Sequence, residues 1–383
     1  MRVAVVHDWL AERGGAERVL EQILLLYPQA TLYALVDFLP ESERDFLGGR
    51  RAITSFIQHL PMARRRFRAY LPLMPLAVAQ WDFSAFDLVI SSSHCVVKSV
   101  RTGPRQLHVS YVHTPMRYAW DLQTLYLQRL RWPLGRAPLR ALLMALRRWD
   151  RRTADRVDYY LANSEFVAGR IHRSYGKRAH VVHPPVYCDQ IPHSAQSEGF
   201  YLTLSRLVPY KRVDLITAAF ARMPDKRLVV IGDGPEWARV AQAANGAPNV
   251  TLLGRLDDEQ ARDYLARCRA FVFAAEEDFG IVPLEAQAAG KPVIAYAGGG
   301  VLETLRPASN GAENAEPVAW FFAEQSVEAI CQAVAQFETT QLSESSAQRC
   351  RENASRFATP LFQARFQEAV ERAQARYAPS IRK

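Results

Sequence analysis

Two basic residues in the second half of the chain are spaced to bind a diphosphate. Arg206 and Lys211 lie five positions apart in SRLVPYKRVDLI, where a strand-like run passes into a helix-like run. Two cations at such a turn can both reach a diphosphate, and the N-terminus of the helix adds backbone donors. Two solvated surface cations would give the same pattern, so this pair alone does not decide the question.

Two acidic residues follow in AEEDFGIVPLEAQAAGKPVIAY. Glu277 is expected in a loop after a strand and Glu285 one to two turns into the next helix. A carboxylate can accept two ribose hydroxyls, and we predict this role for Glu285. Backbone N–H groups at the helix entry, from Phe279, Gly280, Ile281 and Val282, would bind phosphate or sugar oxygens. An acid pair is commonly a solvated face, but its place in the same half as Arg206 and Lys211 favours a shared ligand site.

The first half of the chain offers weaker candidates. Gly14 and Gly15 separate a strand from a helix, so their backbone could approach an anion, although a helix-entry turn explains them equally. His113 ends a strand-like run and could donate to a sugar hydroxyl or stabilise developing positive charge; a structural histidine is the ordinary alternative. His7 and His94 lie at comparable strand ends and rank below His113.

Short apolar runs alternate with helical runs through both halves, which indicates parallel βαβ units. We expect strands at 3–6, 30–37, 87–94, 107–115, 158–166 and 180–186, and again at 200–207, 227–234, 249–256, 269–275 and 291–299. The polar stretch 188–200 reads as a linker. The sequence therefore predicts an α/β protein of two Rossmann-like, doubly wound domains facing a cleft, divided as 1–188, 189–358 and a returning C-terminal helix, 359–383.

Composition excludes several classes of protein. The 383 residues exceed what one core usually supports, and the 49% hydrophobic and 23% charged content is ordinarily globular. The five cysteines are scattered, as in a reduced cytoplasmic protein, and no signal peptide or membrane-spanning run is expected. The GDG segment at 232–234 lacks the third glycine of a dinucleotide fingerprint.

These motifs together resemble the retaining glycosyltransferases of family 4, which have the GT-B fold. The segment from Glu277 to Glu285, with Arg206, Lys211 and Gly14-Gly15, carries the resemblance, which covers nearly the whole chain. GGAERVLEQI and YVHTPMRYAWD are further similar to bacterial mannosyltransferases that build O-antigen and exopolysaccharide. The resemblance implies transfer of a sugar from a nucleotide-sugar, and GDP-mannose is favoured over the UDP-sugars on YVHTPMRYAWD alone.

The resemblance also implies roles for single residues. Arg206 and Lys211 would hold the diphosphate, Glu277 the donor sugar and Glu285 the ribose, while His113 would stabilise the transition state. The other donor-binding positions would be Gly14, Gly15, Gly254, Arg255, Leu256, Phe279, Gly280, Ile281 and Val282. No cofactor and no metal is expected, because cations handle the leaving group and Asp257-Asp258 reads as a helix cap. Same-face attack is preferred, and Glu277 as a nucleophile is the competing mechanism.

Basic residues gather in two apolar segments of the first half, at 63–81 and 128–152. In the second of these, Leu139, Leu142, Leu143 and Leu146 recur at helical spacing among arginines. A basic amphipathic helix is typical of a membrane surface, although a core-packed helix with a solvated basic face fits almost as well. We therefore expect a lipid-linked glycan acceptor and a peripheral location on the inner face of the cytoplasmic membrane.

Three other functions stay open at this point. The net charge of +9 would suit a nucleic-acid-binding protein, but no nucleic-acid motif is present, so no nucleic-acid partner is expected. A sugar phosphorylase or a nucleotide-sugar epimerase would use the same fold. An inactive scaffold is disfavoured because the full set of expected site residues is present.

Overall fold

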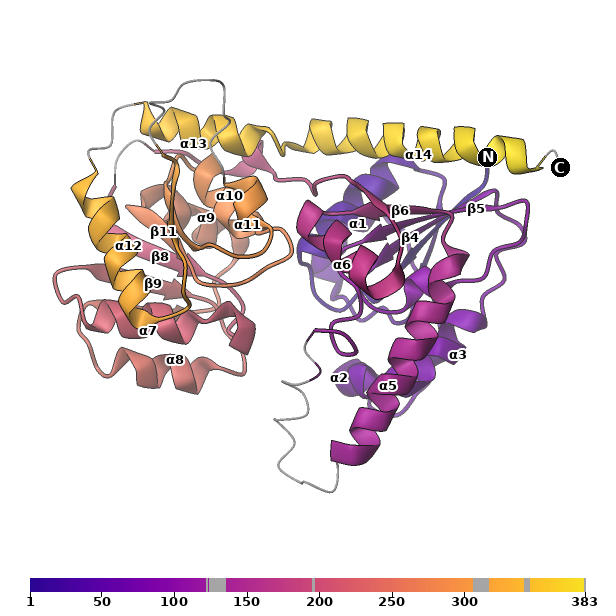
Figure 1. Ribbon diagram of the computed structural model, residues 1–383, viewed down its shortest axis with the longest axis horizontal. Helices are drawn as coiled ribbons and strands as arrows, with labels where there is room; N and C mark the ends of the chain where they lie inside the picture. The colour runs from indigo at the N-terminus through magenta and orange to yellow at the C-terminus, as the bar shows by residue number, and fades with distance from the viewer. Residues whose placement is uncertain (122, 124–135, 195–196, 306–316, 341–344, 382–383) are drawn as a thin grey trace. The chain divides into compact units, whose positions relative to one another are not determined.

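A computed structural model describes the chain except residues 122, 124–135, 195–196, 306–316, 341–344 and 382–383 (Figure 1). The chain forms two compact units. Met1–Pro185 and Phe362–Lys383 make unit 1, and Val186–Leu361 makes unit 2. The expected divisions at 188 and 358 fall close to these.

Unit 1 is built on a seven-stranded parallel sheet. Its strands are β1 (Val3–His7), β2 (Thr31–Ala34), β3 (Ile53–Thr54), β4 (Leu88–Ser93), β5 (Leu107–Val112), β6 (Tyr159–Ala162) and β7 (Ala179–Val181), in the order β3-β2-β1-β4-β5-β6-β7. The chain moves outward from β1 to β3 and then restarts on the other side at β4. The sheet therefore has a topological switch point between β1 and β4, where ligands of open α/β sheets commonly bind.

Helices cover both faces of this sheet. They are α1 (Gly15–Leu26), α2 (Ala63–Arg66), α3 (Met74–Ala79), α5 (Arg136–Arg152) and α6 (Glu165–Tyr175), and the last helix of the chain is α14 (Thr359–Ile381). Val19, Leu20 and Ile23 of α1 share a buried cluster with Phe362 and Phe366 of α14. The return of the C-terminal helix onto the first domain is thus confirmed.

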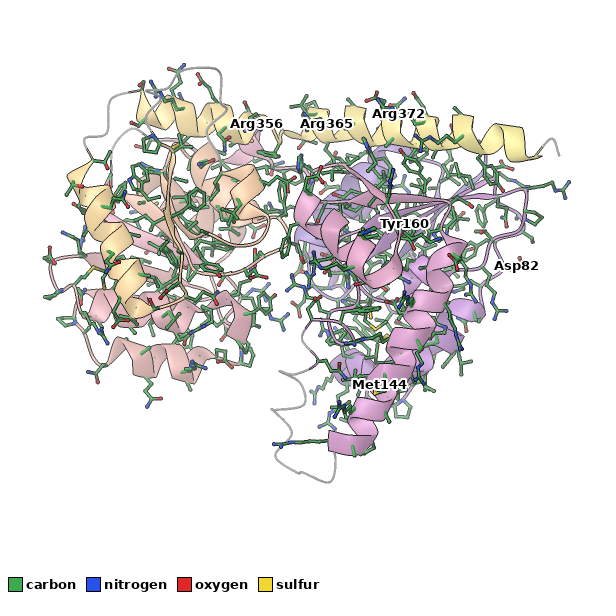
Figure 2. The ribbon with its side chains drawn as sticks, viewed as in Figure 1. Asp82, Met144, Tyr160, Arg356, Arg365 and Arg372 are labelled. Carbon is green, nitrogen blue, oxygen red and sulfur yellow. The ribbon has the colours of Figure 1, made fainter. Side chains whose placement is uncertain are left out.

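The leucine face of α5 lies in the protein core. Leu143 and Leu146 are buried in a cluster with residues of α3, and Leu139 and Leu142 pack against it. The face that the sequence offered to a membrane is therefore already covered. Met144 is 42% exposed on the other side of the helix, among exposed arginines (Figure 2).

Unit 2 has a six-stranded parallel sheet of the same kind. Its strands are β8 (Phe200–Leu204), β9 (Arg227–Ile231), β10 (Val250–Gly254), β11 (Ala270–Phe273), β12 (Val293–Tyr296) and β13 (Ala319–Phe322), in the order β10-β9-β8-β11-β12-β13. Its helices are α7 (Val213–Ala221), α8 (Trp237–Ala244), α9 (Asp258–Arg267), α10 (Ile281–Ala288), α11 (Val301–Thr304), α12 (Val327–Thr339) and α13 (Ser346–Ser355). The switch point lies between β8 and β11.

No helix in the described part of the chain is long and apolar enough to cross a membrane. The described cysteines are all free thiols.

His108 makes the stability of unit 1 depend on pH. Its ring in β5 is fully buried and hydrogen-bonded with Ser91 Oγ (2.9 Å) and the Arg156 carbonyl (2.9 Å). Burial lowers the pKa of His108 from 6.5 to about 4, against the opposing effect of the Arg156 carbonyl. The unfolded chain therefore takes up a proton below pH 6.5, whereas the folded chain does so only near pH 4. We expect unit 1 to lose roughly 3 kcal/mol of stability as the pH falls through this window.

Urea unfolding between pH 7.5 and 4.5 measures this loss. His108→Asn removes the titrating ring, so its stability should fall less steeply with acid than that of the wild type. His59→Asn, at an exposed position, is the matched control and should keep the wild-type slope. Equal slopes for His108→Asn and the wild type would contradict the assignment.

Candidate active site

The predicted ligand residues of unit 2 all follow the carboxyl ends of its strands. Arg206 follows β8 and precedes Lys211, which ends a short helix before α7. Gly254 ends β10 and is followed by Arg255 and Leu256. Glu277, Phe279 and Gly280 lie between β11 and α10, while Ile281, Val282 and Glu285 belong to α10. Because the strands are parallel, these ends share one edge of the sheet.

An ion pair joins the two loops that flank the switch point of unit 2. The ammonium of Lys211, after β8, contacts the Glu277 carboxylate, after β11. Their side chains are only 14% and 15% exposed, so the pair is partly withdrawn from water. An ammonium has three donor hydrogens, so one lysine can hold the carboxylate and a phosphate oxygen together. Arg206 is exposed at the same strand end.

Glycines support the loop that carries Glu277. Gly299 pairs with Glu277 in an isolated parallel bridge, and the Gly300 N–H donates to the Glu277 carbonyl at 2.7 Å. Gly299 has a φ of +75°, and a Cβ there would lie 2.2 Å from the Glu277 carbonyl oxygen. A side chain at this position would displace the Glu277 loop.

Glu285 and Phe279, in the same acidic segment, have different surroundings. Glu285 is 7% exposed in the second turn of α10, as predicted from the sequence. Phe279 is only 3% exposed, and its ring lies edge-on to that of Phe357 at 5.5 Å. The ring of Phe279 thus belongs to the core, and only its backbone can serve a ligand.

The GDG turn after β9 has a packing role. Gly232 has a φ of +137°, and a Cβ there would lie 1.8 Å from the Ser205 carbonyl oxygen. The Gly232 N–H also donates to the Gly254 carbonyl at 2.8 Å. Close approach of neighbouring loops therefore accounts for the glycine without a dinucleotide. Asp257 caps α9 through the Gln260 N–H at 2.8 Å, which confirms the capping role.

In unit 1 the glycine loop is already hydrogen-bonded. Gly14 is the N-cap of α1, and its N–H donates to Glu17 Oε2 at 2.9 Å. Glu17 thus supplies one half of a capping box, since Gly14 has no side chain to complete it. The anion-binding role suggested for Gly14 and Gly15 stays a prediction. The exposed Gly15 begins the helix.

His113 lies after β5, beside two further histidines at the carboxyl edge of the same sheet. Its Nε2 is 2.8 Å from Ser92 Oγ, which is 3.0 Å from His7 Nδ1. The rings of His94 and His113 have centroids 6.3 Å apart. Burial, reinforced by His94 and His7, holds the pKa of His113 well below its ordinary value. His113 is therefore neutral at physiological pH.

The YVHTPMRYAWD segment is held in place by polar contacts from α6 and the end of β6. Asn163 Nδ2 donates to the His113 carbonyl at 2.9 Å. Arg170 of α6 donates to Thr114 Oγ1 at 3.1 Å and pairs with Asp121. These polar contacts therefore fix the backbone that carries His113.

Comparisons with known proteins agree with this geometry. Residues 189–357 match a family described as glycosyl transferases group 1, and residues 13–190 match one described as glycosyltransferase family 4. The two halves of the chain are glycosyltransferase domains.

Relatives of the two glycosyltransferase domains match only in part. The chain is 29% identical over 199 residues to a D-inositol 3-phosphate glycosyltransferase of Mycobacterium sp. (strain JLS), covering 46% of this chain and 44% of the relative. It is 38% identical over 118 residues to a GDP-mannose-dependent monoacylated alpha-(1-6)-phosphatidylinositol monomannoside mannosyltransferase of Corynebacterium glutamicum, covering 27% and 31%. The match thus spans less than half of each relative.

Solved structures show the fold of the whole chain. HepE of Anabaena in complex with UDP has a TM-score of 0.71 at 18% identity, over 97% of this chain and 100% of that one. Sucrose-phosphate synthase of Thermosynechococcus elongatus has a TM-score of 0.69 at 15% identity, over 98% and 100%. The predicted GT-B fold is confirmed.

Sequence reasoning ranked His7 below His113 and gave no role to Ser92 or Glu17, which lie near them in unit 1. His7 and Ser92 are partners in the register of β1 and β4, and Glu17 reaches His7 from α1. Only the strand pairing brings them together, so no local spacing marks them. Among the described residues, no cluster of three or more His, Cys, Asp or Glu side chains is placed to hold a metal ion.

Proposed function

We propose that the protein transfers a hexose from a nucleotide-sugar to a hydroxyl of a lipid-linked glycan, with retention of anomeric configuration and without a metal ion or other cofactor. The Lys211–Glu277 ion pair at the switch point of unit 2, with Arg206 on the same strand end, carries the proposal. A diphosphate bound there meets two cations and the start of α10, which are the donors its departure requires.

The reaction needs charge stabilised in two places. The bond from the anomeric carbon to the diphosphate oxygen breaks, and Lys211 and Arg206 stabilise the negative charge on the leaving group. The acceptor oxygen attacks from the same face, and its proton passes to the departing phosphate oxygen. Glu277 holds Lys211 in position and tolerates the positive charge that develops on the sugar. The ion pair favours this role over that of Glu277 as a nucleophile, which a trapped glycosyl-enzyme would reveal.

GDP-mannose is the donor that we propose. The Corynebacterium glutamicum relative is named as GDP-mannose-dependent, and the YVHTPMRYAWD segment points the same way. UDP is the alternative nucleotide, since the HepE structure contains it. The ribose is common to both, so Glu285 serves either donor.

Calorimetric titration of GDP and of UDP, with EDTA present, tests the donor assignment. We expect one nucleotide to bind the wild type and Glu285→Ala to weaken it at least tenfold, because a carboxylate with two ribose hydrogen bonds is lost. Glu328→Ala, at an exposed carboxylate of α12, is the control and should leave binding unchanged. If neither nucleotide binds with or without added metal, the proposed function is wrong; transfer to inorganic phosphate would indicate a phosphorylase.

A basic surface of unit 1 supports a membrane-bound acceptor. Arg64, Arg65 and Arg66 of α2 are exposed, next to Met62 at 57% exposure, and exposed arginines also line α5. Phe67, directly after α2, shares one buried cluster with Leu143 and Leu146 of α5, so these segments cover the same face of the sheet. With the leucines of α5 buried, attraction to the inner face of the cytoplasmic membrane rests mainly on these arginines and anionic lipid.

Sedimentation with phosphatidylglycerol vesicles tests this attraction. Each arginine near an anionic surface contributes about 1 kcal/mol, so replacing Arg64, Arg65 and Arg66 by glutamine should weaken binding about 100-fold at low salt. Replacing Arg365 and Arg372 (Figure 2) together with Arg376 removes the same charge from another helix, α14, and should change binding far less. Equal losses of vesicle binding in both variants would show that binding depends only on the net charge of the protein, not on the arginines of α2.

A further inference from the structure

Four side chains of unit 1 form a continuous hydrogen-bonded chain that ends at His113. Glu17 Oε1 lies 3.3 Å from His7 Nε2, and His7 Nδ1 lies 3.0 Å from Ser92 Oγ. Ser92 Oγ in turn lies 2.8 Å from His113 Nε2. His7 and Ser92 are completely buried, and Glu17 is 7% exposed, so water does not compete for these contacts.

The Glu17 carboxylate, at one end of this series of hydrogen bonds, determines which atom donates and which accepts in each of them. Burial raises the pKa of Glu17, but the hydrogen bond with His7 leads the interactions that outweigh burial and leave the pKa below its ordinary value. An ionised carboxylate only accepts, so the proton of a neutral His7 must lie on Nε2. His7 Nδ1 then accepts from the Ser92 hydroxyl. Ser92 Oγ, having donated its own hydrogen, accepts from His113 Nε2–H.

We propose that Glu17, His7 and Ser92 are positioning residues that hold His113 in the tautomer protonated at Nε2, leaving Nδ1 as a hydrogen-bond acceptor. His113 is partly exposed, and no other described residue is bonded to its ring nitrogens. The consequence for catalysis rests on the proposed function. In that reaction, His113 Nδ1 accepts a hydrogen bond from a hydroxyl of the donor sugar and so orients the sugar.

The same carboxylate ties this chain to the glycine loop. Glu17 Oε2 accepts the Gly14 N–H at 2.9 Å while Oε1 faces His7. A ligand that displaces the Gly14 loop therefore moves the residue that sets the direction of the hydrogen bonds. The conformation of the loop and the tautomer of His113 are coupled through one side chain.

The surrounding charged groups do not change the direction of these hydrogen bonds. Asp8 is buried, but its carboxylate already accepts four backbone N–H groups, from His94, Cys95, Val96 and Val97, at 2.6–3.1 Å. Burial lowers the pKa of His94, so that ring faces His7 uncharged, with Arg68 beyond it.

Nitrogen-15 NMR of histidine side chains reads the tautomer directly in the full chain. Protonated and unprotonated ring nitrogens of a neutral histidine have well-separated shifts, and His113→Gln assigns the signal. We expect His113 to be protonated at Nε2 in the wild type near neutral pH. Protonation at Nδ1 would overturn the proposal.

Glu17→Gln is the decisive variant. Its amide oxygen can accept the Gly14 N–H in place of Glu17 Oε2, so its NH₂ group must face His7 Nε2. His7 then carries its proton on Nδ1, and the chain reverses, so the His113 proton should move to Nδ1. Glu21→Gln, on the same helix but paired with Arg13, should leave the His113 spectrum unchanged. In a Ser92→Ala background, Glu17→Gln should no longer affect His113.

An unchanged His113 tautomer in Glu17→Gln would overturn the proposal, as would an equal change in the Ser92→Ala background. Activity gives a separate reading. Glu17→Gln should lower kcat about tenfold at nearly constant KM for the donor, since one oriented hydrogen bond is lost. If no sugar transfer is found, the proposed function fails while the spectrum still decides the tautomer. If transfer is found but the His113 spectrum does not respond to Glu17→Gln, only the positioning role of Glu17, His7 and Ser92 is wrong.

Discussion

Replacing Lys211 by methionine is expected to lower kcat for sugar transfer by about 100- to 1000-fold. The loss has two parts. The leaving diphosphate loses a preorganised cation, and Glu277, which contacts Lys211 in a partly buried pair, is left as an uncompensated negative charge close to it. Steady-state rates with the donor that binds best in calorimetry measure the effect.

Two further variants separate these parts. Lys226→Met removes a lysine of the same unit that pairs with Asp225 at 2.7 Å on the surface, and its rate should match the wild type. Adding Glu277→Gln to Lys211→Met removes the stranded charge, so the double variant should bind nucleotide better than Lys211→Met alone. A Lys211→Met enzyme within a few-fold of the wild type would remove the main support for the proposed chemistry.

Replacing Asp150 by alanine is expected to destabilise unit 1 by about 3–5 kcal/mol. The Asp150 carboxylate is fully buried and pairs with Lys98 Nζ at 2.8 Å, where Lys98 is 1% exposed. It also accepts hydrogen bonds from Trp120 Nε1 and the Tyr175 hydroxyl, each at 2.8 Å. Alanine leaves a buried ammonium without its counter-ion and two aromatic donors without an acceptor.

Hydrogen exchange in the full chain locates this loss. Peptides from α5, α6 and β5 should exchange faster in Asp150→Ala, whereas peptides from the sheet of unit 2 should not change. Asp155→Ala, which breaks an exposed pair with Lys177, is the matched control and should leave exchange of the core unaltered. Protection of unit 1 that is unaffected by Asp150→Ala would show that Lys98 is satisfied by other groups, such as the Asp150 carbonyl at 2.8 Å.

The positions of most strands, and of the candidate ligand residues at their ends, could be predicted from the local spacing of apolar residues. Apolar runs of strand length placed most strands, and the positions of Arg206, Lys211, Glu277 and Glu285 at strand ends follow from that alternation. Two strands were missed. β3 has only two residues, and β13 lies in AWFF beyond the last strand-like run that was recognised.

Features that depend on distant pairing could not be predicted. The contact of Lys211 with Glu277 arises because β8 and β11 are neighbours, although β9 and β10 lie between them in the chain. The chain from Glu17 to His113 requires the register of β1 against β4. The leucines of α5 look the same in sequence whether they face lipid or a protein core. Only tertiary packing distinguishes the two, and it places them in the core.

The division of unit 1 into two chain segments has a consequence for the order of folding during synthesis. Domains generally fold in the order in which the ribosome makes them. Here residues 1–185 are made first, yet one face of their sheet is covered by Phe362, Phe366, Ala369, Val370 and Ala373 of α14. Unit 2 is continuous from Val186 to Leu361 and can finish first. The unit that is begun first is therefore completed last, and until then the part of its apolar sheet face that α14 covers stays exposed to solvent.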